Sequence, residues 1–279
     1  MKLVSYLLSG KPRFGILKDD GIIDLTKRLG DKYSDLKSLI GDEAGMKLAE
    51  QLSDSAVDVN EADITYLPVI PNPNKILCVG MNYAEKRAEF NETNPAPTIF
   101  VRFADSQTGH KTAILKPKES NELDYEGELA VVIGKGGSHI PQDKALEYVA
   151  GYSCYMDGSM RDWQYTWFTA GKNWSSTGAF GPCLVTTDEI PDPKQLLIST
   201  YLNDQQVQHD TINNLIHTIP ELIAYISTFT KLSAGDVILT GSPGGVGKKR
   251  NPPLFMKDGD KIEVEITKIG RLINTVKAS

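Results

Sequence analysis

The chain has 279 residues, of which 40% are hydrophobic and 24% are charged, and its formal net charge is −6. This composition is typical of a folded globular protein, and the length allows one large domain with a small appendage, or two domains. The negative charge disfavours nucleic-acid binding, which normally needs a basic surface. No apolar run approaches the roughly 18 residues of a membrane span, and the first residues do not form a signal peptide. We therefore expect no nucleic-acid or membrane partner and a cytoplasmic location.

The first part of the chain predicts short strands at residues 3–6, 13–17 and 21–25. Apolar residues then recur at helical spacing between Leu36 and Leu48. The proline-rich segment at residues 67–73 suits neither a helix interior nor a central strand. We therefore place a boundary near residue 70, with a small N-terminal domain at residues 1–70 and a larger domain at residues 71–279.

The larger domain contains more predicted strands than helices. One or two helical turns are expected at residues 82–90, and a longer helix is expected at residues 142–149, behind Pro141. A capping box, Thr218 to Glu221, starts another helix that we expect to continue to Gly235. The strands are predicted at residues 75–80, 98–103, 129–133, 237–240 and 262–266. Because strands and helices do not alternate regularly, the pattern argues against a doubly wound sheet and predicts a strand-rich α+β fold.

Two glutamates precede the apolar segment at residues 129–133. Residues two apart in a strand point to the same face, so Glu126 and Glu128 should project side by side, with Asp124 as a candidate third member. Buried carboxylates need a cation, and oxygen ligands without His or Cys favour Mg²⁺, Mn²⁺ or Ca²⁺. Asp157, at the end of a strand-like run, is the next candidate ligand. The alternatives are a solvated strand edge for the glutamates and a turn or N-cap role for Asp157.

Two glycine-containing loops are candidates for binding an anionic substrate. One places Lys172 directly after Gly171, and the other, at residues 240–247, places backbone amides and the hydroxyls of Thr240 and Ser242 after a strand. Neither loop has the spacing of a nucleotide-binding motif.

Taken together, five motifs in the same order are similar to those of the fumarylacetoacetate hydrolase family. They are Val79-Gly80-Met81-Asn82-Tyr83, Glu126-Gly127-Glu128, Gly151-Tyr152 followed by Asp157 and Arg161-Asp162, Gly171-Lys172, and Thr240-Gly241-Ser242-Pro243. The resemblance spans residues 75–275. The first seventy residues also resemble the small α/β domain that precedes the catalytic part in many bacterial members.

The resemblance implies a mixed β-roll catalytic domain, a homodimer, and Mg²⁺ or Mn²⁺ held by Glu126, Glu128 and Asp157. Members of this family act on small keto acids. They hydrolyse carbon–carbon bonds in acylpyruvates and 2,4-diketo sugar acids, or they isomerise, tautomerise or decarboxylate related acids. The metal polarises the chelated keto acid, and Lys172 would add a positive charge there. Our leading expectation is a metal-dependent hydrolase of a small 2,4-diketo acid. The alternative is a tautomerase, isomerase or decarboxylase of a short oxo acid such as oxaloacetate.

One departure from the family bears on this choice. Hydrolytic members usually carry a His and, three residues later, a Glu that activate water, and here the corresponding positions hold Lys86 and Glu89. Glu89 remains a candidate general base with Lys86 as its partner, whereas the alternative is that both are exposed helix residues. The missing histidine favours tautomerisation or decarboxylation, which need no attacking water. A catalytically inactive keto-acid sensor is a third hypothesis.

Two residues outside these motifs are further candidates for substrate binding. Arg102 could form a bidentate pair with a substrate carboxylate, unless it is an exposed strand residue. His110 lies in a loop that is similar to a substrate-facing segment in some relatives.

Overall fold

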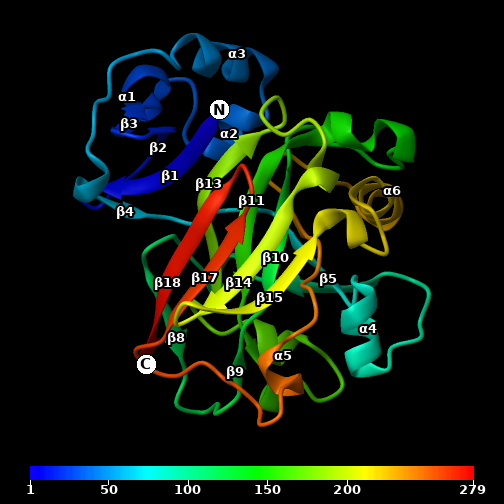
Figure 1. The fold of residues 1–279 in the computed structure, drawn as a ribbon. Helices are drawn as coiled ribbons and strands as arrows, with labels where there is room; N and C mark the ends of the chain where they lie inside the picture. Colours follow the sequence, from blue (N-terminus) through cyan, green and yellow to red (C-terminus); the bar gives the residue numbers. More distant parts are fainter.

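Two large sheets form the body of the protein, and the computed structural model describes residues 1–279 (Figure 1). The predicted strand-rich α+β fold is thereby confirmed. The larger sheet has the strand order β3-β2-β1-β13-β11-β10-β16-β5-β6, with β4 beside β1 and β7 beside β13. Its strands are β1 (Lys2–Leu8), β2 (Lys11–Lys18), β3 (Gly21–Asp24), β4 (Ile64–Tyr66), β5 (Ile76–Gly80), β6 (Thr98–Arg102), β7 (Gln107–Thr108), β10 (Gly127–Ile133), β11 (Val149–Asp157), β13 (Gly178–Thr186) and β16 (Val237–Leu239).

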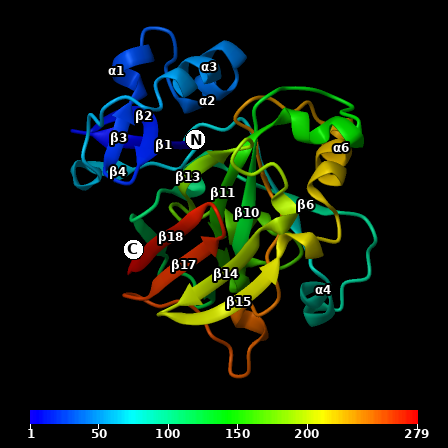
Figure 2. The ribbon, with the colours of Figure 1, turned by 45° about the horizontal axis from the view of Figure 1, so that its top comes forward.

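The second sheet has the order β15-β14-β17-β18-β8 and lies across β10, β11 and β13 (Figure 2). Its strands are β8 (Ala113–Lys116), β14 (Leu197–Leu202), β15 (Gln205–Thr211), β17 (Lys261–Ile266) and β18 (Gly270–Ala278). A short pair, β9 (Leu123–Asp124) and β12 (Ser159–Met160), lies at one end of β10 and β11. The α-helices are α1 (Leu25–Leu29), α2 (Leu36–Ile40), α3 (Glu43–Gln51), α4 (Ala84–Phe90), α5 (Thr169–Lys172) and α6 (Ile219–Phe229).

The N-terminal segment, blue in Figure 1, is joined to the rest of the molecule through the large sheet. Its first strand, β1, pairs with β13 at Lys2↔Val185 and Leu3↔Leu184. Leu36 and Leu39 of α2 belong to the same apolar cluster as Leu184. The strands of residues 1–70 thus continue the sheet of the larger part, and the domain boundary near residue 70 stays a prediction.

Strand β10 is buried along its whole length and separates two apolar cores. Leu129 and Val131 belong to the core that faces the five-stranded sheet, whereas Ala130 and Val132 belong to the core that faces the N-terminal segment. This alternation is the two-residue repeat of a strand. Glu128, two residues before Ala130, therefore shares the face of the second core and lies at the end of β10 where the strand begins.

Two predicted helices differ from the observed ones. The helix predicted at residues 142–149 is a 3₁₀ helix, Gln142–Tyr148. It ends at Tyr148 because Val149 pairs with Ile133 as the first residue of β11. Helix α6 ends at Phe229 rather than near Gly235, because Leu232 is drawn into a bridge with Gly137. None of the helices is long and apolar enough to cross a membrane.

Candidate active site

Three buried carboxylates meet where β10 begins and β11 ends. Glu126 directly precedes β10, Glu128 is its second residue, and Asp157 is the last residue of β11. The antiparallel pairing of the two strands places Gly127 opposite Met156, and the amide of Asp157 donates to the carbonyl of Glu126 at 2.8 Å. Carboxylate oxygens of all three acids lie within 4.8 Å of one another. The structure thus brings the three predicted ligands together, although Glu126 lies just outside the strand that the sequence assigned to it.

The three acids suit a divalent metal ion. Glu128 accepts a hydrogen bond from the amide of Gly241 at 2.9 Å, and no cationic side chain pairs with it. Burial, and then the neighbouring charges of Asp157 and Glu126, raise the pKa of Glu128 well above its ordinary value. A cation between the three carboxylates would remove this repulsion. Because every donor is a hard oxygen, the site fits an ion of the Mg²⁺ or Mn²⁺ type.

Lys172, the last residue of α5, extends its ammonium group between two of these acids. It donates to Oε2 of Glu126 and to Oδ2 of Asp157, and its side chain is almost completely buried. Burial opposes the charge of Lys172, but Asp157 and Glu126 raise its pKa above the ordinary value. The predicted positive charge therefore lies directly at the carboxylates.

Lys86 of α4 also contacts the acids and is not an exposed helix residue. Its Nζ atom lies 2.6 Å from Oε1 of Glu126 and 3.1 Å from Oγ of Ser242, and burial lowers its pKa. Glu89, one turn further along α4, accepts a hydrogen bond from the amide of Gly245 at 2.7 Å, and its Oε2 is buried without a partner. The expected Lys86–Glu89 pair is therefore not formed in the structure.

Arg102 lies behind the acids. Its Nη1 atom is 2.6 Å from Oδ1 of Asp157, and its Nη2 atom donates to Oγ1 of Thr177 at 2.8 Å. The residue is buried, so it is not the exposed strand residue of the alternative interpretation. In this position Arg102 fixes the orientation of Asp157.

His110 and Thr240 make contacts outside the cavity beside the acids. The ring of His110 packs edge-on against Tyr66 at 4.8 Å, and its Nδ1 accepts the amide of Ile273 at 3.1 Å. Burial lowers the pKa of His110 to about 4. The hydroxyl of Thr240 donates to the carbonyl of Leu129 at 3.1 Å. Among the four substrate-binding candidates, only Ser242 lines the cavity.

Sequence reasoning assigned no role to Arg161, which the structure places at the centre of the charge network. Its Nε donates to Oδ2 of Asp124 at 2.8 Å, and its Nη2 lies 3.0 Å from Oε1 of Glu126 without a well-aligned hydrogen bond. Asp124 also accepts the amides of Gly247 and Lys248, so it holds a loop and does not join the ligands. The sequence feature that could have indicated a role for Arg161 is its position, four residues after Asp157 within the same motif.

A small cavity of about 20 Å³ opens beside the acids. Charged and hydroxyl groups form one part of its wall, and apolar side chains form the other. The lining residues are Val79, Gly80, Met81, Lys86, Phe100, Glu126, Glu128, Arg161, Phe168, Lys172 and Ser242.

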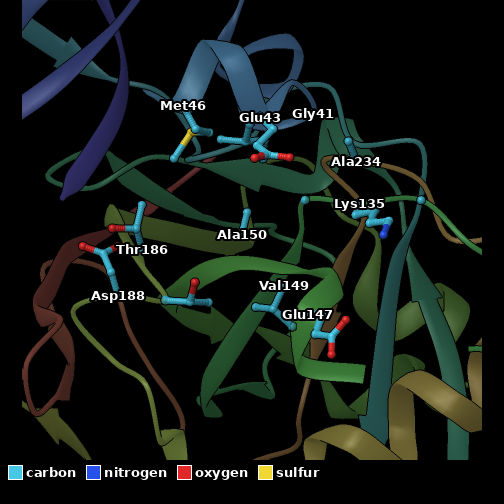
Figure 3. Close-up of a pocket in the computed structure, with 14 residues that line it drawn as sticks. Gly41, Glu43, Met46, Lys135, Glu147, Val149, Ala150, Thr186, Asp188 and Ala234 are labelled. Carbon is cyan, nitrogen blue, oxygen red and sulfur yellow. The ribbon is translucent and has the colours of Figure 1, made fainter. Parts of the chain in front are cut away.

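A much wider cleft of about 630 Å³ lies between α3 and the loops that follow β10 and β13 (Figure 3). Glu43 and Met46 enter it from α3, facing Lys135, Glu147 and Asp188. The cluster of acids that could hold a metal ion is not in this cleft. We therefore assign the chemistry to the small cavity, despite its smaller volume.

The chain is similar to known proteins over most of its length. Residues 75–277 match the family model described as fumarylacetoacetate (FAA) hydrolase C-terminal. The mitochondrial oxaloacetate tautomerase Fahd2a of Rattus norvegicus is 42% identical over 223 residues, which cover 78% of this chain and 71% of the relative. The mitochondrial oxaloacetate tautomerase fahd2 of Xenopus laevis is 40% identical, and the match covers 99% of this chain and 90% of the relative.

Solved structures of relatives have the same fold. The fumarylacetoacetate hydrolase from Exiguobacterium antarcticum superposes with a TM-score of 0.82 at 32% identity over 100% of both chains. The maleylpyruvate hydrolase from Sphingobium sp. SYK-6, in complex with manganese(II) ion and pyruvate, gives a TM-score of 0.84 at 26% identity over 100% of both chains. By the matched model, the coverage of these relatives and the shared fold, the chain belongs to the fumarylacetoacetate hydrolase family.

Proposed function

We propose that this protein is a divalent-metal-dependent tautomerase of a short oxo acid, with oxaloacetate as the first substrate to test. The observation that carries the proposal is the position of Lys86. By the family resemblance it corresponds to the water-activating histidine that hydrolytic members usually carry, and in the structure it contacts Glu126 and Ser242 instead of Glu89. The similarity to two oxaloacetate tautomerases at 42% and 40% identity supports the same choice.

Keto–enol tautomerisation moves a proton between C3 of the oxo acid and its carbonyl oxygen, and no water attacks the substrate. Glu126, Glu128 and Asp157 would hold Mg²⁺ or Mn²⁺, and a bound ion would supply Lewis-acid polarisation of the carbonyl group. Lys172 and Lys86 place two positive charges beside the same cavity, where they favour negative charge on the substrate oxygens. Ser242, within reach of Lys86, offers a hydroxyl to a bound substrate.

Hydrolysis of a 2,4-diketo acid is the second candidate. The likeness to maleylpyruvate hydrolase favours it, since that protein was solved with manganese and pyruvate. Against it, Glu89 binds the amide of Gly245 and lacks a histidine partner for activating water. Hydrolysis, which was the leading expectation from the sequence, is therefore the less well supported of the two reactions.

The two candidates are separated by following three reactions with the same purified protein. The decay of enol-oxaloacetate is followed by its ultraviolet absorbance, decarboxylation by release of pyruvate, and hydrolysis by the fragments of an acylpyruvate. The proposal expects metal-dependent acceleration of enol decay without pyruvate or fragments, and chelation of the metal should remove it. Fragment release without faster tautomerisation would assign the protein to the hydrolases, and saturable binding without turnover would leave a sensor.

The oligomeric state and the cellular location can each be tested separately from the activity. We propose a homodimer, which a mass measurement in solution at working concentration checks. The cytoplasmic location expected from the sequence stays a prediction, because the names of the rat and frog relatives place those proteins in mitochondria.

A further inference from the structure

Glu126 is contacted by three cations at once. Lys86 and the Nη2 atom of Arg161 lie 2.6 Å and 3.0 Å from the same oxygen, Oε1, and Lys172 binds the other oxygen. A metal ion held by Glu126 would draw on the same negative charge. The positive charges of Lys86 and Arg161 would then be neutralised less completely by Glu126 than they are in the structure without the ion.

When the three candidate ligands are deprotonated, as metal binding requires, the charges of the buried side chains at the site sum to zero without the ion. The four buried acids at the site are matched by four buried bases: Asp124, Glu126, Glu128 and Asp157 against Lys86, Arg102, Arg161 and Lys172. A divalent ion therefore leaves two positive charges in a site that is shielded from water. Uncompensated buried charge is costly, so the metal-bound site favours a ligand with two negative charges. A neutral side chain at position 86 would reduce the excess to one, which a single carboxylate can neutralise.

Two donors of this network are available to such a ligand. The ammonium of Lys86 has three N–H donors and uses two contacts, with Glu126 and Ser242. The Nη2 atom of Arg161 is buried and lies 3.0 Å from Oε1 of Glu126 without a well-aligned hydrogen bond, so its N–H groups can turn to a second acceptor. Lys86 and Arg161 both line the cavity. Arg102 does not line it, because its guanidinium is bound to Asp157 on the side away from the cavity.

We infer that Lys86 is a specificity-determining residue that selects oxo acids with a second carboxylate, which it binds together with Arg161. This inference rests on the proposed oxo-acid chemistry and extends it to a substrate class, the short dicarboxylic oxo acids. Val79, Phe100 and Phe168 form the apolar part of the cavity wall. Monocarboxylic oxo acids would bind through the keto-acid end alone.

A pair of matched, non-enolisable probes tests the inference without turnover. Difluorooxaloacetate has two carboxylates and no proton on C3, whereas 3,3-difluoro-2-oxobutyrate carries a methyl group in place of the second carboxylate. Calorimetric titration in saturating Mg²⁺ gives the ratio of their dissociation constants. We expect the natural protein to prefer the dicarboxylate by roughly ten-fold or more, the value of one charge-assisted hydrogen bond.

The variants locate the origin of this preference. Lys86→Met should lose most of the ratio through weaker binding of the dicarboxylate alone, and Lys86→Arg should retain it. Lys144→Met, on the exposed surface beside Glu147, is the matched control and should leave the ratio unchanged. Should Lys86→Met fail to fold, Lys86→Gln, which keeps the length and polarity of the side chain, replaces it in the same titration.

An unchanged ratio in the neutral variant, or an equal loss of affinity for both probes, would overturn the inference. The outcome is independent of the proposed function, because neither probe can tautomerise. If the protein fails to tautomerise oxaloacetate but shows the Lys86-dependent ratio, the proposed function falls and the inference stands. If the protein tautomerises oxaloacetate but shows no Lys86-dependent ratio, the inference falls and the proposed function stands.

Discussion

Nζ of Lys86 lies 2.6 Å from Oε1 of Glu126, a buried ion pair between residues that are 40 positions apart in the chain. The pair connects α4 to the start of β10 and places a lysine side chain directly beside the three acids. By the family resemblance, Lys86 corresponds to the histidine that hydrolytic members usually carry.

Replacing Glu126 with Gln should abolish turnover and also destabilise the fold. The amide keeps the shape of the side chain but leaves Lys86, Arg161 and Lys172 without their shared carboxylate. Breaking a buried ion pair in this way costs about 3–5 kcal/mol. Chemical denaturation measures the loss of stability, and the enol-decay assay measures turnover on the fraction that remains folded. Full activity in this variant would show that Glu126 neither binds the metal nor anchors the cations.

Replacing Arg102 with Met should weaken metal binding and have little effect on the KM of the oxo acid at saturating metal. Arg102 holds Oδ1 of Asp157 at 2.6 Å, and loss of such a supporting contact typically lowers metal affinity by roughly 10–100-fold. Titration of Mn²⁺ followed by electron paramagnetic resonance measures the affinity. Arg271→Met, at a partly exposed pair with Glu265, is the control. A raised KM with unchanged metal affinity would instead support the substrate contact that the sequence suggested.

Replacing Glu89 with Gln should leave tautomerisation of oxaloacetate unchanged. The amide oxygen of glutamine can still accept the hydrogen bond from the amide of Gly245, so the structure of α4 is retained. Any hydrolysis of an acylpyruvate should disappear, because the general base is lost. Both rates are measured on the same preparation, with Glu92→Gln on the following exposed loop as the control. Retained hydrolysis would dismiss Glu89 as the base.

Glu128 predicts an unusual pH dependence of the metal-free protein. Burial and the charges of Asp157 and Glu126 raise its pKa well above 4.5, so the folded state binds a proton more tightly than the unfolded state. The contribution of Glu128 to stability is therefore fully present below pH 4.5 and is lost as the pH rises through the folded-state value. Glu126, with its lowered pKa, acts in the opposite direction and only below 4.5.

Thermal unfolding in the presence of a chelator measures this effect as the difference between the natural protein and Glu128→Gln. The variant should be the more stable of the two at neutral pH, and the difference should vanish on acidification. Addition of Mg²⁺ should stabilise only the natural protein. If the difference in stability did not depend on pH, the pKa of Glu128 would not be raised in the folded state, contrary to this prediction.

The local pattern of the sequence predicted those features that depend on neighbours in the chain. The continuous apolar run at residues 129–133 identified β10, and the two-residue repeat identified β17. The capping box identified the start of α6, and the acids at the start of β10 pointed to a metal site. The fold class and the family are confirmed.

Features that depend on long-range pairing were not predicted. Strand β13 is buried at nearly every position, and the buried face of β18 includes the polar Asn274, so neither strand shows a clear apolar alternation in its sequence. The role of Arg102 depends on Asp157, 55 residues away, and that of Lys86 depends on Glu126, 40 residues away. Residue type alone made Arg102 a plausible anion anchor, but only the tertiary structure shows that its guanidinium is already bound.

The most direct test of the account is anomalous diffraction from crystals of the protein soaked in Mn²⁺. We expect a single manganese peak between the carboxylates of Glu126, Glu128 and Asp157, with the ammonium of Lys172 moved from its position between Glu126 and Asp157. A fully soaked crystal with no peak there, and with Lys172 still bound to both acids, would contradict it.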